Sequence, residues 1–200
     1  MHFTDTITTI DELREVLPEP GGRARAKDIG VIDEHCRDFI ARAPFLLIGT
    51  AGAAGNCDVS PKGDAPGFVQ VLDEHTLLIP DRPGNQRADS LTNLVENPHV
   101  GLLFVVPGVD WTLRVNGRAT IVRDADVLER SAVNGKRPAL GIAVDVEEAF
   151  LHCPRCFARS NLWDTNTWMP EDEHPSFAQV IRDHAKIELP LEVVEQGVAA

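Results

Sequence analysis

The sequence predicts a mainly β protein with flanking helices, an α+β fold in which antiparallel strands form a small closed or split barrel. Five or six short runs rich in β-forming residues are separated by turns, and helical segments are interspersed among them. No G-x-G-x-x-G sequence follows a strand and no P-loop is present. The usual dinucleotide-binding and nucleoside-triphosphate-binding folds are therefore disfavoured.

The first 43 residues are predicted to form a helical extension. Residues 11–17 have apolar side chains at the i, i+3, i+4 spacing of a helix, with Thr8 or Thr9 available as the N-cap. A segment rich in proline and glycine then ends this helix. A second helix is predicted over residues 33–43, and the side chains expected on its apolar face are Cys36, Phe39 and Ile40.

Residues 44–150 are predicted to form the barrel. The period changes from helical to extended at Pro44, and one hairpin joins 68–72 to 76–79. Gly117 interrupts the apolar alternation of its strand and indicates a bend or bulge. Helices are expected over 89–96 and 125–133. The predicted strands cover residues 45–50, 68–72, 76–79, 100–106, 111–122 and 140–144, and residues 57–60 are predicted to be short and extended.

Composition narrows the classes of function. The net charge of −12 argues against a broad nucleic-acid-binding surface, which needs clustered lysine and arginine. Positive charge is nevertheless concentrated locally, which favours a small anionic ligand. No apolar run is long enough for a membrane helix, and the N-terminus does not resemble a secretory signal. We therefore expect a cytoplasmic protein that binds neither membranes nor nucleic acids.

The strongest candidate site lies before the helix predicted to begin near Asp89. Arg82, Asn85 and Arg87 precede that helix, and Ser90 offers a hydroxyl in its first turn. Free backbone N–H groups and the positive end of the helix dipole favour an anion there, and guanidinium groups match phosphate oxygens. Asp89 is the predicted N-cap. The alternative interpretation is a loop whose arginines form surface ion pairs.

Three segments resemble the FMN-binding split-barrel family, the group that includes pyridoxamine 5′-phosphate oxidase. They are Ser60-Pro61-Lys62-Gly63, the helix ending in Asn97-Pro98 with the strand after it, and the strand Thr112-Leu113-Arg114-Val115. The resemblance covers residues 44–122. Within the family, the sequence looks closest to a branch described as probable FMN-dependent enzymes. It implies a homodimeric split barrel of antiparallel Greek-key type that binds FMN non-covalently at the dimer interface.

The resemblance also implies a set of cofactor-binding residues. Lys62, in a predicted Pro/Gly turn, would approach the polar edge of the flavin, and the residues before it would supply backbone contacts. An apolar bed for the ring would come from the strand that ends at Pro80. The full predicted set is Asp58, Val59, Ser60, Pro61, Lys62, Leu78, Ile79, Pro80, Arg82, Asn85, Arg87, Ser90, Thr112, Arg114, Arg159, Ser160 and Trp163.

Two departures from the oxidase pattern weaken the case for oxidation of vitamin B6. Thr112 stands where the oxidase has a glutamine, and Asp89-Ser90 stand where it has an arginine–lysine pair. The expected activity is therefore that of an FMN-dependent oxidoreductase that takes electrons from a reduced donor to an unidentified small-molecule substrate. An F420-dependent reductase of the same fold, and a flavin-binding protein without turnover, are the alternatives.

Residues 151–200 are predicted to form a helical segment that packs on the barrel or at the dimer interface. Cys153 and Cys156 form a C-x-x-C pair, but no second pair completes a tetrahedral zinc site, so we expect reduced thiols and no metal. His152 is interpreted either as an interior histidine with satisfied hydrogen bonds or as an acid/base. A surface helix is expected over 174–184.

Overall fold

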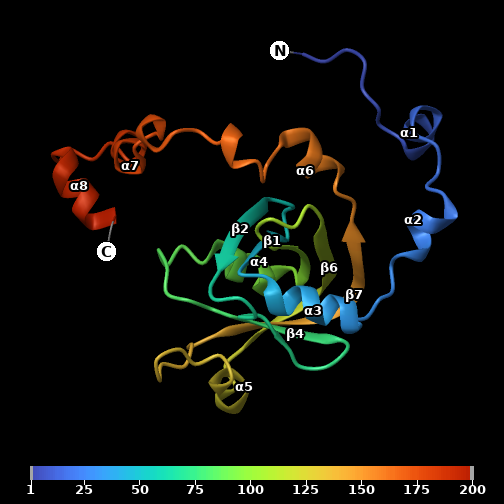
Figure 1. The fold of residues 1–200 in the computed structure, drawn as a ribbon, viewed down its shortest axis with the longest axis horizontal. Coiled ribbons are helices and arrows are strands. Elements are labelled where there is room, and N and C mark those ends of the chain that lie inside the picture. Colours follow the sequence, from blue (N-terminus) through green and yellow to red (C-terminus); the bar gives the residue numbers. More distant parts are fainter. Residues whose placement is uncertain (1, 199–200) are drawn as a thin grey trace. The chain divides into compact units, whose positions relative to one another are not determined.

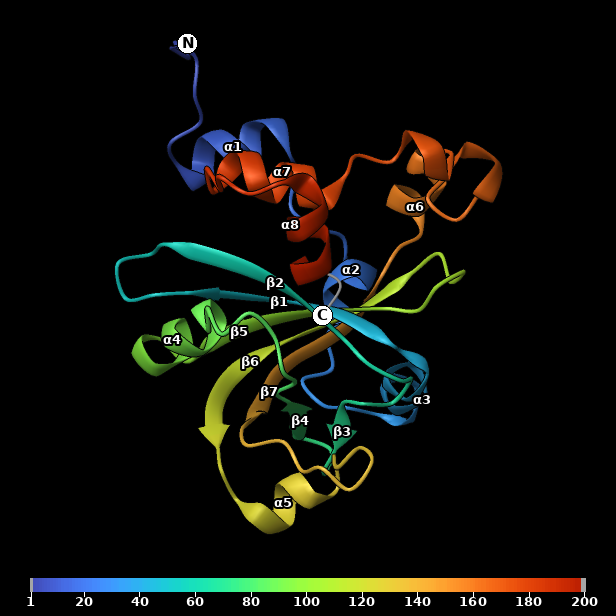
Figure 2. The same ribbon diagram turned by 90° about the vertical axis from the view of Figure 1, so that its left-hand side faces the viewer.

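The computed structural model describes residues 2–198, which divide into two compact units with the boundary between Ala158 and Arg159. The first unit contains all the strands of one seven-stranded sheet with the order β2-β1-β5-β6-β7-β4-β3, and every pairing in it is antiparallel. Figure 1 shows these strands with α3 and α4, and Figure 2 shows β2, β1, β5, β6 and β7 following one another. The predicted antiparallel α+β fold with flanking helices is confirmed.

Two short helices precede the sheet. Helix α1 (Ile10–Val16) has the predicted N-cap, Thr9, whose side chain and that of Glu12 form a reciprocal capping box. None of its residues is buried, and Val16 is 67% exposed, so α1 has no packing role within its unit. Helix α2 (Gly22–Ala26) follows the Pro/Gly-rich segment and was not predicted.

Helix α3 (Glu34–Arg42) packs on the core as its sequence pattern indicated. The Asp33 carboxylate accepts a hydrogen bond of 2.8 Å from the backbone N–H of Cys36, which caps the helix. The predicted apolar face is buried, and the Phe39 ring lies 4.5 Å from that of Trp111. Burial raises the pKa of the Cys36 thiol to about 12, so this thiol stays protonated and acts as a core side chain.

The strands of the sheet alternate buried and half-exposed residues, which gives the barrel one core face and one outer face. Leu46, Ile48, Leu102, Phe104 and Leu113 are among the fully buried side chains. The strands are β1 (Phe45–Ala51), β2 (Cys57–Gly63), β3 (Gln70–Val71), β4 (Thr76–Pro80), β5 (His99–Val105), β6 (Thr112–Val122) and β7 (Gly141–His152).

The predicted bulge at Gly117 is confirmed. The register of β6 against β7 shifts between Asn116 and Gly117. A Cβ atom at Gly117 would overlap the carbonyl oxygen of Asp145 on β7, so only glycine allows the two backbones to approach this closely.

Two strands are longer than predicted. Strand β2 continues through Pro61 and Lys62, which pair with Leu47 and Leu46 of β1, so Lys62 lies in a strand and the predicted turn there is wrong. Strand β7 continues to His152, where only 140–144 was predicted. Its second half carries Glu147 and Glu148. Glutamate is uncommon in strands, so the apolar pattern that predicts a strand is interrupted there.

Helix α4 (Asp89–Glu96) lies between β4 and β5 in the chain, as predicted, and α5 (Ala125–Glu129) is shorter than the predicted 125–133. Helix α6 (Arg155–Ser160) crosses the boundary between the units. The second unit continues with η1 (Thr165–Thr167), η2 (Glu171–Glu173), α7 (Phe177–His184) and α8 (Leu191–Val198). None of the helices within residues 2–198 has both the length and the apolar character needed to cross a bilayer.

Candidate functional site

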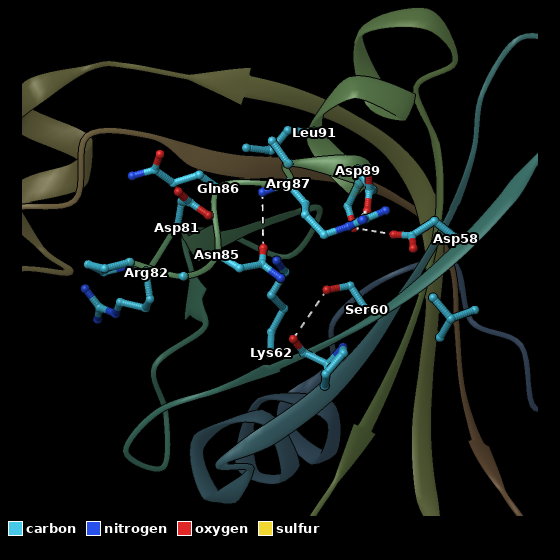
Figure 3. A pocket seen from close by; sticks show the side chains of 16 residues that line it. Asp58, Ser60, Lys62, Asp81, Arg82, Asn85, Gln86, Arg87, Asp89 and Leu91 are labelled. Atoms are coloured by element: carbon cyan, nitrogen blue, oxygen red, sulfur yellow. Dashed lines mark hydrogen bonds and ion pairs between the residues drawn. The ribbon is translucent and has the colours of Figure 1, made fainter. Parts of the chain in front are cut away.

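An open pocket of about 370 Å³ lies between strand β2 and the loop that joins β4 to α4 (Figure 3). Its volume is within the range of about 300–1,000 Å³ that small-ligand sites occupy. The structure brings together here nine of the seventeen residues predicted to bind the cofactor. They are Asp58, Val59, Ser60, Pro61, Lys62, Arg82, Asn85, Arg87 and Ser90.

The loop that covers this pocket, residues 81–88, has an unusual backbone. Gln86 and Ala88 both have left-handed φ angles, 61° and 56°, although neither is glycine. Such residues gather at functional sites, where the surrounding structure holds them in place. Ala88, and not the predicted Asp89, is the N-cap of α4, and no side chain caps this helix. Its first backbone N–H groups are therefore available to an anion.

Arg82 lines the pocket, but two neighbours outside it hold its guanidinium group. Its Nε donates to Oδ2 of Asp64 at 2.6 Å, and its Nη1 donates to the carbonyl oxygen of Ser131 at 2.9 Å. In Figure 3 the Arg82 side chain points away from Lys62 and Asn85. The predicted contact of Arg82 with a phosphate stays a prediction. Arg82 links the start of the loop to Asp64, directly after β2, and to the segment after α5.

Arg87, at the other end of the loop, is open to solvent. Its Nε donates to Oδ2 of Asp89 at 2.8 Å, with the two side chains 72% and 46% exposed. The hydrogen bond and the charge of Asp89 raise the pKa of the Arg87 guanidinium. Asn85 fixes the chain here, because its Oδ1 accepts a hydrogen bond of 3.1 Å from the Arg87 N–H. Since exposed ion pairs are weak, a stronger anion can displace Asp89 from Arg87 at little cost.

Lys62 supplies a second cation. It is half-buried on β2, and Figure 3 shows its ammonium group directed toward Asn85. Within residues 2–198, Lys62 forms no ion pair. A strand position holds its Cα more firmly than the predicted turn would, and its charge is available for a ligand.

Ser90 is buried and engaged by a neighbour in the same pocket. Its hydroxyl donates to Oδ2 of Asp58 at 2.8 Å, a contact that joins the first turn of α4 to β2. The hydroxyl proton is directed at Asp58, and the predicted contact of Ser90 with a phosphate stays a prediction. Donors that remain for an anion include Lys62, Arg87 and the first N–H groups of α4.

Five predicted residues of the same unit lie outside this pocket. Leu78 and Ile79 are fully buried core residues of β4, although Pro80 at its end borders a neighbouring pocket that shares residues 60–62 and 82–85. Thr112 is buried at the start of β6, and Arg114 lies over the Phe150 ring, with its Cζ 5.2 Å from the ring centroid. Their predicted contacts with a cofactor stay predictions.

Three predicted residues belong to the second unit, and their contacts with a cofactor also stay predictions. Arg159 and Ser160 form the end of α6, and Trp163 follows it.

His152 ends β7 in the first unit, and its buried Nε2 has no hydrogen-bond partner among the described residues. It is therefore not the interior histidine with satisfied hydrogen bonds that one interpretation predicted.

The sequence reasoning missed Asp64, Ser131, Asp81 and Gln86. Asp64 and Ser131 hold Arg82, yet they lie 18 and 49 residues from it in the chain, so no local spacing could have indicated them. Asp81 and Gln86 line the pocket and belong to the same polar loop as Arg82 and Asn85. Their place in that loop was the only available signal.

The lining fits a phosphate ester in part. Its ionisable side chains balance in charge: three acidic ones (Asp58, Asp81, Asp89) face three basic ones (Lys62, Arg82, Arg87). In a chain of net charge −12 this is a relatively positive place. Asp58 and Asp89 are each already held by a donor, which limits their repulsion of a ligand. No set of three or more His, Cys, Asp and Glu side chains in the described part of the chain is arranged to hold a metal ion.

A family model described as pyridoxamine 5′-phosphate oxidase matches residues 32–153, more than half of the chain. The chain therefore belongs to this family, and the resemblance noted from its sequence is confirmed, as is the split-barrel fold which that resemblance implied. The matched region includes the whole sheet and the pocket of Figure 3. No curated protein is significantly similar to the sequence.

Solved structures with a similar fold come from proteins of several kinds. HupZ of Group A Streptococcus is 19% identical, with 60% of this chain and 93% of HupZ covered and a TM-score of 0.49. An FMN-binding protein of Syntrophomonas wolfei is 14% identical, with coverage of 58% and 83% and a TM-score of 0.46. An F420 reductase is 18% identical, with coverage of 58% and 94% and a TM-score of 0.40. Similarity at this level assigns neither a ligand nor a reaction to this chain.

Proposed function

We propose that the protein is an FMN-dependent oxidoreductase and that the pocket between β2 and the loop 81–88 holds the flavin mononucleotide without a covalent bond. The observation that carries the proposal is the convergence of Lys62, Arg87 and the uncapped start of α4 on one pocket, in a chain of the pyridoxamine 5′-phosphate oxidase family. These groups are the donors that a phosphate monoester requires.

The residues of the chain would divide the work of binding. Arg87 would exchange Asp89 for the phosphate, while the N–H groups of α4 approach the same oxygens. Lys62 would lie along the polar side of the ligand, where a cation stabilises negative charge on a reduced ring. Arg82 would keep the loop in place through Asp64 and Ser131, without touching the ligand. Bound FMN would supply the two-electron chemistry, so none of these residues has to act as a nucleophile.

We also propose that the protein is a homodimer and that the outer face of β2, β1 and β5 forms its interface. Pro61, Leu47 and Leu103 are paired across these strands and share this face. Val59 is 65% exposed and Phe45 is 36% exposed on the same face. Since Val59 and Pro61 also line the pocket, a second subunit on this face would border the cofactor.

The test of the cofactor is to denature the purified protein and identify the released chromophore by mass. We expect FMN, and absorption of the intact protein near 450 nm, as is general for flavins. Release of F420 would contradict the proposal and favour an F420-dependent reductase of the same fold. Release of no chromophore, together with no thermal shift on adding FMN, would show that the pocket has been misassigned.

The test of turnover is separate. NAD(P)H, or another reduced donor, should bleach the bound flavin, and a small acceptor should restore it. A flavin that stays oxidised with every donor, in a protein that retains FMN, would identify a flavin-binding protein without turnover. Sedimentation of the same sample should show a dimer, and Leu47→Glu, on the middle strand of the proposed interface, should give a monomer.

A further inference from the structure

A second group of basic residues lies away from the pocket, around the ring of Phe150 near the end of β7. The Lys27 Nζ is 4.8 Å from the centroid of this ring and the Arg114 Cζ is 5.2 Å from it. The His152 ring is next to it as well, with its centroid 5.3 Å from that of Phe150. None of these four residues lines the pocket of Figure 3.

Three separate elements bring this group together. Arg114 of β6 is paired with Phe150 of β7, so the two side chains lie on the same face of the sheet. His152 is two residues further along β7 and shares that face. Lys27 arrives from the segment after α2, where its Nζ donates to the carbonyl oxygen of Leu151 at 3.1 Å and the N–H of Ile29 donates to that of Ala149.

The positive charge of this group has no matching carboxylate. Within residues 2–198, neither Lys27 nor Arg114 forms an ion pair, and Glu148, which precedes on the same strand, is held by the Nδ2 of Asn116 at 2.7 Å. The Phe150 ring attracts either cation but carries no net charge to balance them. Burial, followed by the charges of Arg114 and Lys27, lowers the pKa of His152.

His152 adds a polar atom that is not satisfied. Its Nε2 is buried without a hydrogen-bond partner in the described structure. Buried polar atoms nearly always have partners, so an atom of this kind indicates a missing ligand, ion or water. The two cations and this nitrogen surround one aromatic ring.

We infer that Lys27, Arg114 and His152 form a binding site for the carboxylate or phosphate group of a small ligand, with the Phe150 ring beside the ligand's apolar part. A guanidinium, an ammonium and an imidazole N–H are all donors to an oxyanion, and an aromatic ring suits a flat apolar group next to it. The site is distinct from the phosphate site proposed above. Arg114 and Pro61 lie in one row across four strands, which places them roughly 14 Å apart.

The site also suggests the class of substrate. If FMN occupies the pocket, an anionic organic molecule is the substrate that this second site would recruit, and this part of the inference depends on the proposed function. The binding of an oxyanion does not depend on it, because Lys27, Arg114, Phe150 and His152 contact one another and lie outside the pocket proposed for FMN.

The test follows the imidazole signals of His152 by NMR in the full chain as purified, with the signals assigned by comparison with His152→Gln. Benzoate and inorganic phosphate are titrated at constant ionic strength against sodium chloride. We expect a saturable shift of the His152 signals with one or both anions. Arg114→Gln and Lys27→Gln should each weaken binding by about tenfold, as expected for the loss of one charge-assisted hydrogen bond.

Two further variants keep the test decisive. Arg114→Lys preserves the charge and should retain most of the affinity, which separates loss of charge from loss of folding. Arg118→Gln is the matched control, because Arg118 lies on the same strand but contacts His99 through its Nη1 at 2.9 Å. It should leave the titration unchanged.

The inference is overturned if the His152 signals do not respond, or if Arg114→Gln and Lys27→Gln respond as the wild type does. It is also overturned if the signals change with protein concentration and not with added anion, since the occupant is then a carboxylate of a second copy. Neither result affects the identification of FMN by mass, so failure of this site and failure of the proposed cofactor are distinguished.

Discussion

The β6–β7 ladder and the loop 81–88 are held in place in two different ways. The ladder pairs the two strands from Thr112–His152 to Val122–Gly141, with buried side chains such as Leu113 and Val115 on its core face. The loop depends on a few side-chain contacts, chiefly those of Arg82 with Asp64 and with the carbonyl oxygen of Ser131. Many strand pairings and buried side chains therefore hold the barrel, whereas the shape of the pocket depends on a small number of charged groups.

This difference means that the pocket can be altered while the barrel survives. It also distinguishes Arg82 from Arg87, which the sequence analysis had placed together as phosphate-binding residues. Arg82 is a positioning residue with a side chain 25% exposed, and Arg87, with 72% exposed, is the one that can reach a ligand. The predictions below test this comparison, from the largest expected effect to the smallest.

The largest effect is expected from Gly117→Ala, which tests the barrel. The new Cβ would overlap the Asp145 carbonyl oxygen, so β6 and β7 must separate at the bulge. We expect a loss of about 2–4 kcal/mol in the free energy of unfolding, measured by urea denaturation. Gly22→Ala in α2 is the control, because nothing lies within 4 Å of its added Cβ. Equal stability of the two variants would show that the ladder is not closely packed at the bulge.

A smaller effect is expected from Arg82→Ala, compared with Arg87→Ala. Arg82→Ala should lower the free energy of unfolding by about 1–2 kcal/mol, because it removes the hydrogen bonds that Arg82 donates to the Asp64 carboxylate and to the Ser131 carbonyl oxygen. It should also weaken FMN binding, through displacement of the loop.

Arg87→Ala should weaken FMN binding by about tenfold through loss of a charged donor, with no change in the urea midpoint. Flavin fluorescence on dilution measures the affinity of both variants. If the two arginines change stability and affinity in the same proportion, their different roles are disproved. If both variants keep full flavin occupancy after dialysis, the phosphate site lies elsewhere.

The smallest effect concerns pH. The backbone N–H of Ala65, and then Arg82, lower the pKa of the Asp64 carboxyl. The stabilisation by this carboxylate is therefore fully present above its unfolded-state pKa of about 3.9 and is lost as the pH falls through the lower, folded-state value. Asp64→Asn should be less stable than the wild type by about 1 kcal/mol at pH 7. The difference should shrink below about pH 4.

Urea denaturation at several pH values checks this expectation. The double variant Asp64→Asn/Arg82→Ala should lose less than the sum of the single variants, since both remove the same contact. A stability difference that does not vary with pH, or strictly additive losses, would show that the pair contributes nothing to the position of the loop.

Much of the fold could be predicted from local patterns. The cap of α1 at Thr9, the buried face of α3 and the bulge at Gly117 all depend on residues close in sequence and on simple periodicity. The extension of β7 through Glu147 and Glu148 could not be predicted, because its pairing with β6 overrides the low strand preference of these residues. The placement of Lys62 in a strand has the same cause, since β1 pairs with it across the sheet.

By itself the sequence determined the antiparallel barrel, the family and the polar loop before α4, because strand periodicity, turn residues and the order of motifs are properties of neighbouring residues. The tertiary structure decided which of the loop's charged side chains face a ligand. Asp64 and Ser131, distant in the chain, draw Arg82 inward, and two left-handed residues leave the start of α4 open. Contacts of this kind arise only when folding brings remote groups within hydrogen-bonding distance.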